Sequence, residues 1–196
     1  MAFTAGEILT PYLYSNFSQR PLTINMGQGF YKSDQHWQIG QAVVEDGFFK
    51  LKADSVSGHS TQLNNASVQL DASALDKVYA FYFLPVITQE LAQLKVEGSA
   101  NAKLLFDDQK IREYQLSLSD VNIEHMPASG NPKFSFNNLQ GNLHASHSAV
   151  TIDSFLRFDG ANLYDTVEFG SINIPLEASS QSIAISETSR LPVFDG

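Results

Sequence analysis

The sequence predicts a mostly β fold: a curled antiparallel sheet, groove-, taco- or sandwich-like in form, with one short kinked apolar helix. Three observations lead to this expectation. Many segments alternate apolar and polar residues with a period of two, which is typical of half-buried strands. Turn-forming pairs such as Asp46-Gly47 and Asp159-Gly160 separate these segments. A single segment, residues 79–87, is apolar without alternation.

The alternating segments account for about ten strands, mostly in an antiparallel meander. The alternation changes parity at Ser119-Asp120 and at Gly170-Ser171, which indicates a bulge or a change of face. Further turns are expected at Ser57-Gly58 and Asp107-Asp108. The segments are residues 22–31, 36–44, 48–56, 94–106, 115–123, 150–158, 167–176 and 181–186.

Residues 74–94 predict a helical insertion between strands. Ser73 is the expected N-cap, with Asp76 completing a capping box, and Pro85 is expected to end or kink the helix. The middle of this segment is apolar nearly all round, so it needs cover on more than one side. Packing in a core, contact with a bilayer and sealing of an apolar groove all satisfy that need. A further short helix is expected within residues 8–17.

Length and charge restrict the class of protein. We expect the 196 residues to form a single β-rich domain, residues 1–196, excised from a longer chain, because the first ten residues lack the basic start and apolar run of a signal peptide. The net charge of -9 and only 12 Lys and Arg residues argue against a nucleic-acid partner. The chain has no cysteine, which excludes disulfides and thiolate chemistry.

No motif indicates catalysis or a cofactor, so we expect a protein that is not an enzyme, with no cofactor and no metal site. Sequences of the GxSxG, Walker A and GxGxxG types are absent. The pair His144 and His147 resembles a metal-ligand pair, but residues three apart in a strand point to opposite faces.

Aromatic residues near the N-terminus support an alternative function. Phe30, Tyr31 and Trp37 lie close together in predicted strands, and exposed aromatic rings can stack on sugars. The alternative is therefore a non-catalytic extracellular β-sandwich that binds carbohydrate or a protein partner.

The order of several short motifs resembles the AsmA-like group of bacterial envelope proteins, which includes the TamB-type chains. The resemblance covers about residues 40–177 and depends on motif order, since each motif is degenerate. The matching residues are Leu84-Pro85, Gly98, the strand with Leu116, Leu118, Asp120, Val121 and Ile123, and the strand with Asn138, Leu139, Gly141 and Leu143.

The resemblance implies a periplasmic module of a chain anchored in the inner membrane, which takes part in phospholipid transport or outer-membrane assembly. It also implies an elongated sheet whose apolar face lines a groove for the acyl chains of a lipid. The expected wall residues are Leu116, Leu118, Phe134, Phe136, Ile152, Phe155, Phe169, Ile172 and Ile174, and the expected lid residues are Tyr79, Phe81, Tyr82 and Phe83.

Overall fold

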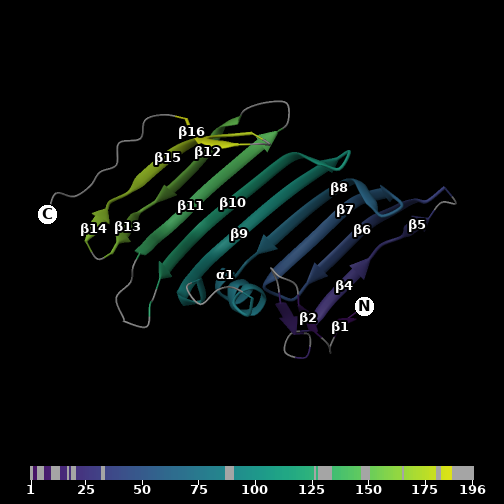
Figure 1. The fold of residues 1–196 in the computed structure, drawn as a ribbon, viewed down its shortest axis with the longest axis horizontal. Coiled ribbons are helices and arrows are strands. Elements are labelled where there is room, and N and C mark those ends of the chain that lie inside the picture. Colours follow the sequence, from purple (N-terminus) through teal and green to yellow (C-terminus); the bar gives the residue numbers. More distant parts are fainter. Residues whose placement is uncertain are drawn as a thin grey trace.

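In the computed structural model, most of the described residues belong to one large antiparallel sheet (Figure 1). It describes residues 2–3, 7–9, 14–16, 18, 21–31, 34–86, 91–125, 127, 134–146, 151–164, 166–179 and 182–186. Within this part of the chain the main sheet has 14 strands, and β2 (Glu7–Leu9) and β3 (Tyr14–Asn16) form a separate hairpin. The mostly β prediction is confirmed. The sheet is not strongly curled, and the described strands do not form two packed sheets.

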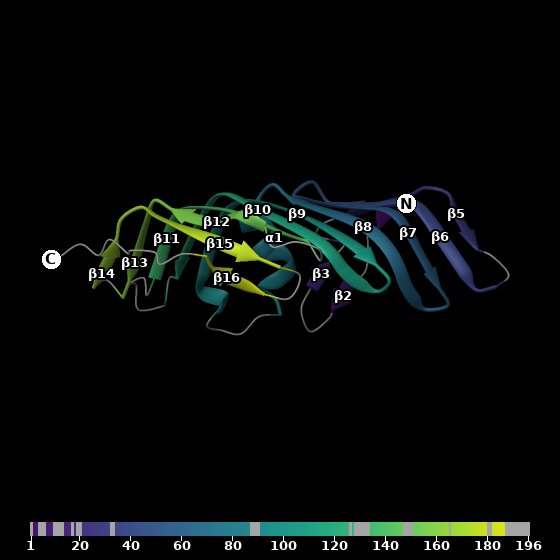
Figure 2. The same ribbon diagram turned by 90° about the horizontal axis from the view of Figure 1, so that it is seen from above.

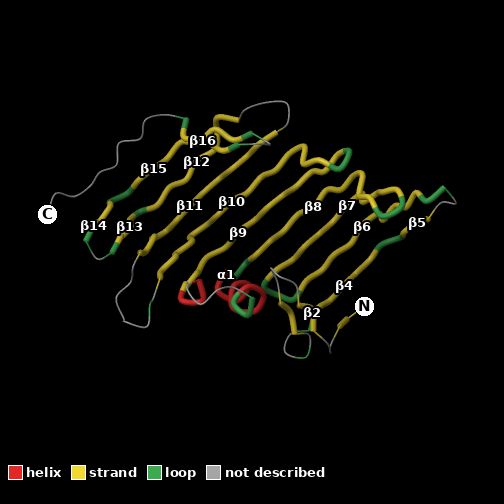
Figure 3. Tube along the Cα trace, in the orientation of Figure 1, coloured by secondary structure: helices red, strands yellow, loops and turns green. Residues whose placement is uncertain are grey.

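The strands follow one another across the sheet almost in chain order (Figure 3). The order is β1, β4, β6, β7, β8, β9, β10, β11, β12, β15, β16, with β5 beside β6 and β13 between β11 and β14. Their bounds are β1 Ala2–Phe3, β4 Leu22–Met26, β5 Gly29–Tyr31, β6 His36–Glu45, β7 Phe49–His59, β8 Gln62–Ala72, β9 Leu94–Asp107, β10 Lys110–His125, β11 Phe134–Ser146, β12 Thr151–Phe158, β13 Gly160–Leu163, β14 Val167–Phe169, β15 Ile172–Ala178 and β16 Ile183–Ile185.

The expected turns are right in part. Asp46-Gly47 connects β6 to β7, and Asp108 begins the turn between β9 and β10. Ser57-Gly58 lies inside β7 instead of forming a turn. Asp159 is only a bend, after which β13 continues to pair with β11 as β12 does.

Alternation gives the sheet one apolar and one polar face. Directly opposed residues of neighbouring antiparallel strands share a face, so each register row can be assigned to one side. One row across six strands, from β6 to β11, reads Val44, Leu51, Leu70, Ala102, Leu116 and Leu143. The adjacent row, on the other face, reads Val43, Lys52, Gln69, Lys103, Gln115 and His144.

A line of bulges crosses the sheet and preserves this segregation. Gly98, Asp120 and Asn138 have positive φ values of 110°, 53° and 50°. The β9–β10 and β10–β11 registers shift beside Asp120, which confirms the predicted parity change at Ser119-Asp120. Because each bulge adds a residue, Leu118 and Val121 pack in the same apolar cluster although they are three residues apart.

The helix is short and lies on the apolar side of the sheet. The four residues of α1 (Leu75–Val78) continue directly into the five-residue π-helix η1 (Tyr79–Phe83), which ends before Pro85 as predicted. A single 3₁₀ turn, η2 (Leu91–Gln93), leads into β9. Figure 2 shows the helix and the β2–β3 hairpin on the same side of the sheet.

Two local predictions in this region are wrong. The N-cap residue is Ala74 and makes no side-chain cap, because the hydroxyl of Ser73 donates instead to the backbone carbonyl of Phe48, 3.2 Å away. The carboxylate of Asp76 pairs with Lys77 at 3.0 Å instead of completing a capping box. The helix expected within residues 8–17 is also not found: the described residues there belong to β2 and β3.

Candidate functional site: the apolar face of the sheet

The apolar face carries large side chains that the described part of the protein covers incompletely. Among the described residues only ten apolar side chains are buried, and five of these are alanines. Four of the five larger ones gather in one cluster on the C-terminal half of the sheet: Val121, Leu139, Phe158 and Ile172, with Ala161. At the two ends of the face, Met26 is 64% exposed and Ile185 is 61% exposed.

The helix partly covers a cavity on the N-terminal half of this face. The cavity has a volume of about 410 Å³ and lies between strands β4, β6, β7 and β8 and the helix. Its lining is almost entirely hydrocarbon: Leu22, Val44, Phe49, Leu51, Leu70, Ala72, Val78, Tyr82 and Phe83, with Ser15 from β3.

The aromatic side chains of the helix divide between burial and exposure. Tyr82 is buried and meets the ring of Phe49 edge to face, with ring centroids 5.2 Å apart. Phe83, which lines the cavity, is 40% exposed. Partial burial raises the pKa of the Tyr79 hydroxyl above its ordinary value of 10.0.

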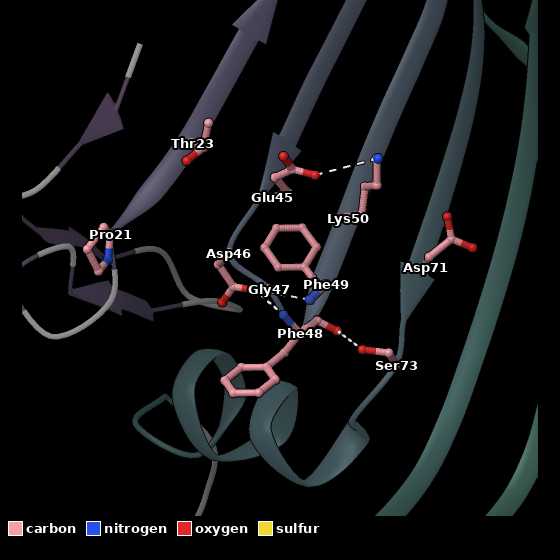
Figure 4. A pocket seen from close by; sticks show the side chains of 10 residues that line it. All are labelled: Pro21, Thr23, Glu45, Asp46, Gly47, Phe48, Phe49, Lys50, Asp71 and Ser73. Carbon is pink, nitrogen blue, oxygen red and sulfur yellow. Dashed lines mark hydrogen bonds and ion pairs between the residues drawn. The ribbon is translucent and has the colours of Figure 1, made fainter.

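The turn between β6 and β7 holds the helix at this end of the sheet (Figure 4). Asp46 Oδ1 accepts hydrogen bonds from the backbone N–H groups of Phe48 and Phe49, at 2.9 and 3.0 Å. The Tyr82 hydroxyl donates to Asp46 Oδ2. The carbonyl of Phe48 accepts from both the N–H and the hydroxyl of Ser73, at 2.9 and 3.2 Å. The turn therefore fixes both the start and the last turn of the helix.

Most of the expected wall residues lie together on the apolar face. Five of them belong to or pack against the C-terminal cluster, and these five come from β10, β11, β14 and β15. Phe134 extends this set, since its ring stacks on His125 and lies 6.2 Å from the ring of Phe136. The expected wall residues that lie on the apolar face are therefore Leu116, Leu118, Phe134, Phe136, Phe169, Ile172 and Ile174.

Two expected residues lie elsewhere, and a third has a side chain outside the described residues. Phe155 is opposite Asn142 and Pro175, on the polar face, because the apolar positions of β12 are the neighbouring Leu156 and Phe158. Phe81 stacks on Phe48 at the end of the sheet, with centroids 6.5 Å apart, and does not line the cavity. Ile152 belongs to β12, but its side chain lies outside the described residues.

The cavity residues of the N-terminal half were not predicted as site residues. Leu22, Val44, Leu51 and Leu70 occupy the apolar positions of alternating segments. Their alternation was visible in the sequence, but only the fold shows that the end of the helix returns over these strands, while Leu75 at its start packs against the C-terminal cluster.

One polar side chain of the apolar face is buried with a nitrogen that makes no hydrogen bond to any described residue. His125 is 8% exposed, and its Nδ1 has no hydrogen-bond partner among the residues that the structure describes. Ser154, also on this face, is buried but satisfied, because its hydroxyl donates to the His144 carbonyl and accepts from the His144 N–H.

Other kinds of site are not found in the part of the chain that the structure describes. No three His, Asp or Glu side chains there converge as metal ligands. His144 pairs with Glu113 at 3.3 Å, and His147 lies outside the described residues. None of the described helices is long and apolar enough to cross a lipid bilayer.

Comparisons with profiles of protein families, with curated proteins and with solved structures gave no match. The resemblance to AsmA-like proteins therefore stays a prediction.

Proposed function

We propose that this chain binds the acyl chains of a lipid along the apolar face of its sheet. The observation that carries the proposal is the face itself: a continuous run of apolar register rows that the described residues cover only in part, with the helix and the β2–β3 hairpin on the same side. A soluble protein rarely leaves so wide an apolar surface without an occupant.

The free energy of transfer makes an acyl chain a suitable occupant. Each buried CH₂ group contributes about 0.8 kcal/mol, so a sixteen-carbon chain exposed to water is disfavoured by on the order of 12 kcal/mol. The eleven strands on the main path of the sheet span about 50 Å at the usual strand spacing of ~4.8 Å. Such a face is long enough for an acyl chain to lie across several strands while the polar face stays in water.

The biological setting follows from the AsmA-like resemblance and is part of the same proposal. The chain would be a non-enzymatic module of a periplasmic protein, anchored in the inner membrane through other parts of a longer chain. It would take part in phospholipid transport or outer-membrane assembly, acting by apolar contact. A groove would then form where the gently bent sheet, the helix and a lipid meet.

Native mass spectrometry of the purified chain tests the binding of lipid. We expect phospholipid to co-purify with the wild-type protein and to be lost from Phe83→Asp and Leu70→Asp, two partly exposed positions that line the cavity. The matched control for Leu70→Asp is Gln69→Asp, the adjacent position of β8 on the polar face, which should keep its lipid.

Circular dichroism melts establish that each variant is folded before its lipid content is compared. A wild-type protein that takes up no phospholipid from vesicles would overturn the proposal. So would equal loss of lipid from the folded Leu70→Asp and Gln69→Asp variants.

A further inference from the structure

The cavity beneath the helix differs from the rest of the apolar face because part of its lining is buried. Tyr82 and Ala72, which line it, are 5% and 4% exposed, and Ser15 of β3 is 6% exposed. Phe83 and Leu70 line the same cavity but are 40% and 36% exposed. The cavity is therefore most accessible beside Phe83 and Leu70, and a ligand would enter from that side.

The described lining of the cavity carries no charged side chain. Its polar groups are the hydroxyls of Ser15 and Tyr82, and the Tyr82 hydroxyl already donates to Asp46 Oδ2. A carboxylate or phosphate placed inside would lose its water without gaining a cation, which is costly. The methyl end of an acyl chain has no polar group to desolvate. It is therefore the part of a lipid that suits this cavity, with the polar end outside.

The volume of the cavity limits how much of a chain it can hold. A methylene group takes up about the 30 Å³ that a water molecule occupies in the liquid. The volume of about 410 Å³ is thus enough for about 14 methylene groups. Two chains of sixteen carbons would need about twice this volume, so only one chain fits.

We propose that the cavity selects a single acyl chain by its length and takes up about 14 carbons of it from the methyl end. This inference rests on the proposed binding of acyl chains and names the part of the lipid that is recognised. Inside the cavity, the strands and the helix cover a chain from two sides (Figure 2). Carbons beyond it meet the open part of the apolar face, where the second chain of a phospholipid would also lie.

A series of saturated fatty acids tests this inference. Acids of eight to eighteen carbons, each below its critical micelle concentration, are titrated into the delipidated protein by calorimetry. We expect the affinity to rise about four-fold with each methylene group up to about fourteen carbons, the gain for a fully buried CH₂. Beyond this limit each methylene group should add about two-fold or less, because the chain is then covered on one side only.

Two variants that fill the cavity should lower the limit. Ala72→Leu adds three carbon atoms and should move the limit to about eleven carbons, and Ser15→Leu should move it to about twelve. The control is Ala53→Leu, on the same apolar face of β7 but outside the described lining, which should leave the limit unchanged. Circular dichroism melts establish that each variant is folded. If a filled variant does not fold, the series measured on the wild type decides alone.

Failure of this inference is separable from failure of the proposed function. An affinity that rises by the same factor through eighteen carbons overturns the inference, because an open face without a length-limiting cavity gives that result, while lipid binding itself stands. An unchanged limit in both folded filled variants overturns it in the same way. If neither fatty acids nor phospholipids bind, the inference and the proposed function both fail.

Discussion

Tyr82 and Asp46 join the helix to the sheet: the hydroxyl of Tyr82 donates a hydrogen bond to Asp46 Oδ2, while the other oxygen of the same carboxylate accepts two backbone N–H groups of the β6–β7 turn. The phenol ring beneath this bond packs edge to face on Phe49. One side chain of the turn therefore organises its own backbone and positions the helix above the apolar cavity.

Removing the Tyr82 hydroxyl should weaken the attachment of the helix to the sheet, while the aromatic ring stays in place. We expect Tyr82→Phe to lower the free energy of unfolding by about 1–2 kcal/mol, because a buried bond to a carboxylate is lost while the ring still packs on Phe49. Urea denaturation measures this change. Tyr164→Phe, at a tyrosine that is 73% exposed, is the control and should be neutral. Equal midpoints for Tyr82→Phe and the wild type would contradict the anchoring role of this bond.

The bulge at Gly98 should tolerate no side chain. Its φ of 110° disfavours any other residue, and a Cβ there would lie 2.7 Å from the carbonyl oxygen of Asp120. We expect Gly98→Ala to destabilise the protein by roughly 2–4 kcal/mol.

Gly47→Ala is the control for Gly98→Ala, because it tests the cost of a positive φ without a close steric contact. It also has a positive φ, 91°, but no atom lies within 4 Å of its Cβ position. Gly47→Ala should therefore lose only about 1 kcal/mol. If thermal melts show equal losses for the two variants, the close contact between β9 and β10 is not what requires Gly98.

Replacing His125 should stabilise the protein. Its buried Nδ1 has no partner in the described part of the chain, and its ring already stacks on Phe134 with centroids 5.4 Å apart. His125→Phe removes the unsatisfied polar atom and keeps an aromatic ring, so we expect a gain of about 1–2 kcal/mol in chemical denaturation. A loss of stability would show that the imidazole has a role that its described surroundings do not reveal.

The polar face contains a carboxylate whose ionised form is favoured by folding. The Lys52 ammonium, 2.8 Å away, and then the Gln41 amide hold the pKa of Asp54 below its ordinary value of 3.8. Because the folded pKa is the lower one, the stabilisation is complete above the ordinary value and is lost as the pH falls through the folded pKa. NMR titration of the Asp54 carboxyl should show this lowered pKa, and Lys52→Met should raise it. An unchanged Asp54 pKa in Lys52→Met would contradict the assigned cause.

The alternation of the sequence was sufficient to predict most strands and the bulge beside Asp120, because side-chain parity follows directly from strand geometry. At Gly170-Ser171 it predicted a change of parity, and the structure has two separate strands there, β14 and β15. It was not sufficient where a residue serves a distant partner. Gly58 has the composition of a turn but lies within a strand to make room for Trp37. Ser73 has the position of an N-cap but bonds the carbonyl of Phe48, 25 residues away in the chain.

The same distinction applies to the candidate site. The apolar positions of β10, β11 and β15 could be predicted from their pattern, and Phe155 was misplaced because Phe155 and Leu156 are adjacent apolar residues of which only one can face inward. The cavity beneath the helix could not be predicted, since it depends on a chain reversal after β8 that brings Phe83 over Leu51 and Leu70.

Paramagnetic relaxation from a spin-labelled lipid tests the central claim most directly. A phospholipid with a nitroxide on its acyl chain is added to the methyl-labelled protein. If the acyl chain lies on the apolar face, it should broaden the methyl signals of Leu70, Leu116 and Ile174 and spare those of Val43 and Leu105, which lie on the polar face. Equal broadening on the two faces, or none on either, would contradict the account.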